Sequence, residues 1–174
     1  MKKAGLFLII AIFMSSSIVL AREPDIRNVN WGMSREEVIK LEGQPILSDF
    51  DALYYETSIN SLDTVLIYFF TDDKLTQAVY YITETHTNPD FYLDDYYELK
   101  QLLQKEYGRG TETITWSNDL FRNDPGTALL YGYVEYSAVW ETNRTRIVQG
   151  LYRDNFEVTH ILAYVSLEFQ DKLK

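Results

Sequence analysis

The sequence predicts an α+β protein in which two helix-plus-antiparallel-sheet units follow each other along the chain. Three observations favour this class. Two amphipathic segments, 34–43 and 88–108, begin and end with helix-capping residues. Apolar segments separated by short polar turns follow each of them. These strands come in runs after each helix, which is typical of antiparallel sheets with the helices packed on the sheet.

Residues 1–21 have the pattern of a signal peptide. Lys2 and Lys3 form a basic start, residues 4–14 are continuously apolar, and Ala21 ends a Val-Leu-Ala sequence that suits a signal peptidase. The apolar run is shorter than the roughly 20 residues that a membrane span needs, and three serines follow it. We expect cleavage after Ala21 and a periplasmic or secreted protein with no membrane span after signal cleavage.

The composition excludes several classes of protein. The formal charge is −10, and loss of the two lysines in residues 1–21 makes it two units more negative, −12. Nucleic acids and anionic membranes need a basic surface, so neither is an expected partner. The chain has no cysteine, which excludes disulfides, thiol nucleophiles and thiolate metal sites. We expect one compact domain built from two units, 22–87 and 88–174.

The first unit begins with a short helix whose two ends are marked. Ser34 and Glu37 are spaced as a capping box, Gly43 supplies a left-handed end, and Pro45 prevents continuation. After this helix, strands are predicted over 52–57, 64–70 and 75–83, which gives the unit the order α-β-β-β. The second and third of these strands flank a polar turn of hairpin length, Thr71-Asp72-Asp73-Lys74.

The second unit begins with a longer helix. Asn88 is a plausible N-cap, Pro89 suits the first helical position, and Gly108 ends the segment. Its apolar residues recur at helical spacing: Tyr92, Tyr96, Leu99, Leu103 and Tyr107. The unit has the order α-β-β-β-β, with a loop over 118–126 and strands predicted over 111–117, 128–141, 144–153 and 157–169.

Residues 31–38, Trp-Gly-Met-Ser-Arg-Glu-Glu-Val, with Gly43-Gln44-Pro45 after them, form a motif. It resembles the start of small exported bacterial proteins, among them the outer-membrane-assembly lipoproteins of the SmpA/OmlA (BamE-like) type. The element order is also similar to the β-lactamase-inhibitor-protein-like (BLIP-like) fold, where a helix-plus-sheet unit is duplicated. The resemblance implies this fold and an envelope or secreted location. It transfers no functional residues, because the motif is a helix cap and the lipoprotein cysteine is absent.

The sequence contains no evident catalytic or metal-binding constellation. The two histidines, His86 and His160, are isolated, and no Gly-x-Ser-x-Gly motif occurs. A catalytic zinc ion needs about three protein ligands, which two isolated histidines do not provide. The paired aspartates do not fit the spacing of a calcium-binding loop. We therefore expect no enzyme, no metal and no cofactor. A hydrolase with an unrecognised carboxylate pair is an alternative, because the separation of such a pair is set by the fold.

Alternation along the last three long strands indicates a candidate binding face. Residues such as Ile161 and Ala163 are expected to point inward. The opposite face is expected to carry Tyr131, Tyr133, Arg146, Tyr152, His160 and Tyr164. Aromatic side chains with polar tips, together with arginine, are enriched at recognition surfaces. Tyrosine also suits half-buried strands for structural reasons alone.

The expected function is non-enzymatic binding or envelope assembly. The aromatic face would hold a protein or peptide from the envelope or the secreted proteins, and the acidic charge favours a basic one. The first alternative is a periplasmic binder of small molecules or glycans that uses the same aromatic side chains, and the hydrolase is the second.

Overall fold

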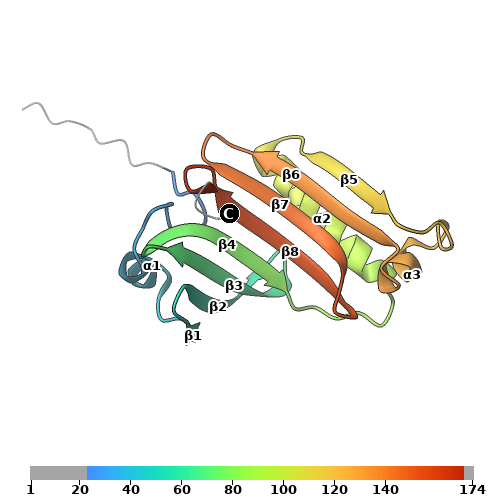
Figure 1. The fold of residues 1–174 in the computed structure, drawn as a ribbon, viewed down its shortest axis with the longest axis horizontal. Helices are drawn as coiled ribbons and strands as arrows, with labels where there is room; N and C mark the ends of the chain where they lie inside the picture. The colour runs from blue at the N-terminus through green and yellow to red at the C-terminus, as the bar shows by residue number, and fades with distance from the viewer. Residues whose placement is uncertain (1–22, 171–174) are drawn as a thin grey trace, which may run out of the picture.

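The computed structural model describes residues 23–170, which form one antiparallel sheet of eight strands with helices beside it (Figure 1). The predicted α+β class is confirmed. The predicted signal peptide, 1–21, lies outside the described residues. Within residues 23–170, no helix is both long enough and apolar enough to cross a membrane.

The elements agree with the predicted order apart from two additions, the short strand β1 and the short helix α3. They are α1 (Arg35–Glu42), β1 (Leu47–Ser48), β2 (Ala52–Ile59), β3 (Leu62–Thr71), β4 (Lys74–Ile82), α2 (Asp90–Tyr107), β5 (Thr111–Trp116), α3 (Pro125–Leu130), β6 (Val134–Glu141), β7 (Thr145–Asp154) and β8 (Glu157–Ser166).

The capping residues of α1 act as the sequence predicts. The backbone N–H of Ser34 donates to the Glu37 carboxylate at 2.8 Å, and the Glu37 N–H donates to the Ser34 hydroxyl at 3.3 Å. Gly43, with a φ of 90°, ends the helix. For α2, Asn88 accepts from the Asp90 N–H at 3.2 Å, and the helix begins one residue later than expected.

The prediction of a continuous strand over 128–141 is wrong in its first part. Residues 125–130 form α3, and the strand starts only at Val134. Asp124 caps α3 by accepting a hydrogen bond from the Thr127 N–H at 3.2 Å, and Pro125 fixes the first helical φ. The cap at Asp124 therefore determines the local structure of this segment.

The strand order is β1-β2-β3-β4-β8-β7-β6-β5. Each half of the chain contributes a meander of four consecutive strands. The two meanders join where β4 pairs with β8, with Val79 opposite Ala163. The last strand of each half therefore lies at the centre of the sheet, and both halves share one hydrogen-bonded surface.

α1 and α2 lie on the same face of this sheet, which we call the helix face. One row across it is Tyr55, Leu66, Tyr80, Leu162, Gln149 and Ala138, each opposite the next. At one end of this row, the Tyr55 hydroxyl donates to the carbonyl of Gly43, the residue that directly follows α1, at 3.1 Å. Near the other end, Gln149 donates to the carbonyl of Tyr96 in α2 at 2.9 Å. The core lies between these helices and the helix face, and in Figure 1 α2 is seen behind β6 and β7.

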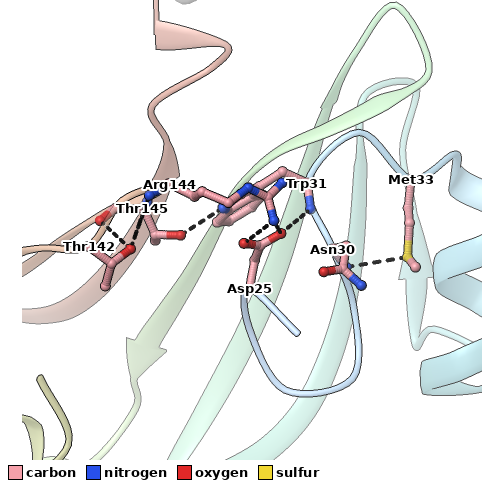
Figure 2. A network of polar contacts seen from close by, with 7 residues as sticks. All are labelled: Asp25, Asn30, Trp31, Met33, Thr142, Arg144 and Thr145. Carbon is pink, nitrogen blue, oxygen red and sulfur yellow. Dashed lines mark hydrogen bonds and ion pairs between the residues drawn. The ribbon is translucent and has the colours of Figure 1, made fainter. Parts of the chain in front are cut away.

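A polar network ties the segment before α1 to the second half of the chain (Figure 2). The Asp25 carboxylate accepts from the Arg144 guanidinium at 2.7 Å and from the Trp31 N–H at 2.9 Å. The Trp31 indole donates to the Thr145 hydroxyl of β7 at 2.8 Å. Trp31 is buried, so the motif that starts with it links the two halves in addition to capping α1.

The turn between β2 and β3 gives a first testable prediction. Asn60 and Ser61 have positive φ values of 51° and 67°, as in a two-residue hairpin that favours Asn-Gly. Ser61→Gly is expected to raise the free energy of unfolding in urea by about 0.5 kcal/mol, because relief of the left-handed backbone outweighs the added chain entropy. The matched change Ser58→Gly within β2 should lower it, and a fall for both variants would contradict this account.

Candidate binding face of the sheet

The face opposite the helices, which we call the open face, carries an apolar row across the sheet. The row is Tyr54, Ile67, Val79, Ala163, Val148 and Val139, each directly opposite the next on the neighbouring strand. A second row runs beside it, formed by Val65, Tyr81, Ile161 and Gly150. Phe69 and Val165 extend the apolar surface on the other side.

No helix in residues 23–170 covers the open face, which is turned toward the viewer in Figure 1. Its apolar side chains are mostly half-buried, because neighbours on a sheet shield one another, and Val79 at the centre is buried. An antiparallel sheet with one free face normally alternates apolar inside and polar outside. This sheet is apolar on both faces, which is typical of a surface that contacts another molecule.

Two tyrosines, Tyr81 of β4 and Tyr152 of β7, flank Ile161 of β8 on this face. Tyr81 is 40% exposed. A Cβ on Gly150 would lie 3.4 Å from the Tyr152 ring and 3.5 Å from Ile161, so the ring leans across the bare backbone of Gly150. Burial raises the pKa of the Tyr152 hydroxyl, and the nearby Tyr81, Asp154 and Glu135 groups raise it further. Two tyrosines with carboxylates nearby therefore occupy this part of the open face.

The structure does not bring the six predicted residues together on one surface. Arg146 and Tyr152 lie on the open face. His160 and Tyr164 are 3% and 6% exposed and lie on the helix face, so their assignment to an outer face is wrong. Ile161 and Ala163, expected to point inward, occupy the open face instead.

Tyr131 and Tyr133 lie before β6, at the end of α3. Their rings stack with that of Phe121, whose centroid is 5.3 Å from Tyr131 and 6.1 Å from Tyr133. Gly132, with a φ of 70°, separates the two tyrosines at the turn into β6. They form a corner cluster at the end of the sheet and are no part of the apolar row.

His160 is held as a structural, neutral imidazole. Gln149 uses its amide N–H groups for the Tyr96 carbonyl and for His160 Nε2, 3.1 Å away, so Nε2 accepts and Nδ1 carries the proton. Burial lowers the pKa of His160 to about 4. Its ring also packs against that of Tyr96, with centroids 6.0 Å apart. These contacts fix α2 on the sheet.

His86 also has a structural explanation. Its Nε2 lies 2.6 Å from the Asp95 carboxylate, and its backbone N–H donates to the Tyr92 hydroxyl at 3.0 Å. The ring meets Phe91 and Tyr92 edge-on. All of these partners belong to α2, so His86 anchors the connection between β4 and α2.

Among residues 23–170, no group of three or more histidine, cysteine, aspartate or glutamate side chains is placed to hold a metal ion. Comparison of the chain with protein-family models, curated proteins and solved structures gives no match. The function has to be inferred from the fold and from the open face.

Proposed function

We propose that this protein is an exported, non-enzymatic binding protein that holds a protein or peptide on the open face of its sheet. The observation that carries the proposal is the apolar row from Tyr54 to Val139, which crosses six strands and is not covered by any helix of residues 23–170. A contiguous apolar surface that is left uncovered in this way marks interaction sites on soluble proteins.

The shape and rigidity of the face suit this role. Its strands are joined by hydrogen bonds across the whole sheet, and the helices on the other side pack on its core. A preformed surface loses little conformational entropy when a partner docks. Tyr81 and Tyr152 provide large, stiff contact side chains of the type enriched at interface centres.

The proposal also includes the tandem arrangement of the two halves and the exported location, both of which are expected from the sequence. We interpret the two halves as tandem units, each with one main helix and a four-stranded meander, in line with the resemblance to the β-lactamase-inhibitor-protein-like fold. Pairing of β4 with β8 then gives a face twice as wide as one unit provides. The signal peptide at 1–21 directs the protein to the envelope or the exterior, where this face meets its partner.

A charge placed in the apolar row is expected to abolish partner binding. Val148→Lys puts an ammonium group at the middle of β7, and desolvating it on docking is costly. The matched control is Leu102→Lys, because Leu102 is an apolar residue of α2 that is 37% exposed. A photocrosslinking amino acid at Tyr54 should capture a discrete protein in the native cell in wild type and in Leu102→Lys, but not in Val148→Lys.

Both variants must first show cooperative melting, so that loss of capture reports the face and not the fold. Equal capture by Val148→Lys and wild type would reject the proposal. A thermal-shift screen against sugars and other small molecules tests the alternative ligand class, since a ligand stabilises the state it binds. Stabilisation by a sugar that Val148→Lys removes would assign the face to a glycan instead.

A further inference from the structure

We propose that the partner of the open face is a basic protein segment, and that one of its lysine or arginine side chains sits between Tyr81 and Tyr152. This inference rests on the proposed function of the open face. It adds the chemical class of the partner and the place at which the partner is anchored.

The strand register brings the two tyrosines to one place. Tyr81 of β4 is opposite Ile161 of β8, which is opposite Gly150 of β7. Because Gly150 has no side chain, the Tyr152 ring leans over it toward Ile161. The tyrosines thus stand on either side of Ile161, with Tyr81 40% exposed and Tyr152 half-buried. A cation placed against tyrosine rings gains cation–π attraction.

Carboxylates surround this position. Glu135 and Asp154 are close enough to Tyr152 to act on its hydroxyl electrostatically. At the same end of the strands, β2 and β3 add Glu56, opposite Val65, and Asp63, opposite Ser58. All four acidic residues are exposed. A lysine or arginine between the tyrosines would therefore find charge-assisted hydrogen-bond acceptors around the aromatic surface.

The cations of the face lie elsewhere. Arg146 is opposite Glu141 and Val165, and Lys74 is opposite Thr71, toward the other end of the strands. A second copy of this chain without residues 1–21 would bring a formal charge of −12 toward another −12. Charge complementarity at an interface favours partners of opposite sign, so a basic partner fits better than self-association.

The test uses three synthetic probe peptides with the same alternating sequence, in which every second residue is valine and the others are arginine, lysine or glutamine. Dissociation constants with the protein lacking residues 1–21 are measured by fluorescence anisotropy at two salt concentrations. The arginine and lysine peptides are expected to bind at least tenfold more tightly than the glutamine peptide, with the advantage shrinking at high salt.

Variants locate the anchor. Glu135→Gln combined with Asp154→Asn should weaken arginine-peptide binding about tenfold, and Tyr152→Leu should do so while keeping an apolar surface. The control Glu36→Gln removes an exposed carboxylate of α1 and should change nothing. Failure of the arginine peptide to bind, or an unchanged affinity in the Glu135 and Asp154 variant, would overturn the inference.

The outcomes separate this inference from the proposed function. Equal binding of the glutamine and arginine peptides, lost in Val148→Lys, would keep the open face as a binding surface and reject the basic partner. Peptide binding unaffected by Val148→Lys would reject both. A dimer in sedimentation experiments that Val148→Lys dissociates would assign the face to a second copy and overturn the inference.

Discussion

Arg144→Ala is expected to lower the free energy of unfolding by about 2 kcal/mol, because it removes the charge-assisted hydrogen bonds that the guanidinium donates to a buried carboxylate. The Asp25 side chain is 6% exposed and its partner Arg144 is 29% exposed, with 2.7 Å between the charged atoms. The same carboxylate positions the Trp31 N–H, and the Trp31 indole reaches Thr145. Loss of Arg144 therefore loosens the junction between the two halves of the sheet.

Urea unfolding of the wild type, Arg144→Ala, Asp25→Asn and the double variant measures this effect as a cycle. The double variant should lose less stability than the sum of the single variants, since the two groups act on each other. Arg122→Ala provides the control, because Arg122 and Asp119 form an exposed pair that contributes little. Equal effects of Arg144→Ala and Arg122→Ala would show that the network in Figure 2 does not hold the halves together.

Acid is expected to destabilise the protein through His160 before most carboxylates titrate. Burial lowers the pKa of His160 to about 4 in the folded protein, against 6.5 as the ordinary value. Between these values the unfolded chain binds a proton that the folded chain does not, so stability falls as the pH drops from 6.5 toward 4. The full contribution of this one group is about 3 kcal/mol.

The variant His160→Gln isolates this effect. It lacks the titrating group, so its free energy of unfolding should fall by about 3 kcal/mol less than that of wild type between pH 7 and pH 4. Acidic residues contribute equally to both curves and cancel in the comparison. Parallel curves for the two proteins would mean that His160 is protonated in the folded state without penalty, which contradicts its burial beside Gln149.

Local signals predicted much of the fold. The capping box at Ser34 and Glu37, the glycine ends at Gly43 and Gly108, and the polar turn at Asp72 and Asp73 all act within a few residues of themselves. Their hydrogen bonds form with neighbours in sequence, so the sequence displays both partners. The missed helix α3 also had a local signal, the Asp124 cap followed by proline.

The candidate site was predicted less well. Period-two alternation gives the set of side chains that share a face, but it does not say which of the two faces is packed against the helices. In β8 both sets are largely apolar, so tyrosine and histidine tips suggested an outer face for Tyr164 and His160. Gln149 and the aromatic rings of α2 provide buried partners for these side chains, and this could not be read from β8 alone.

The sequence by itself determined the α+β class, the extents of most helices and strands, the absence of cysteine chemistry and the acidic charge, because these depend on composition and on short-range hydrogen bonding. Only the tertiary structure decided that β4 pairs with β8, that α1 and α2 lie on one face, and that the row from Tyr54 to Val139 is left open. Such long-range pairings depend on which surfaces can be buried together, and that free energy is set by residues distant in sequence.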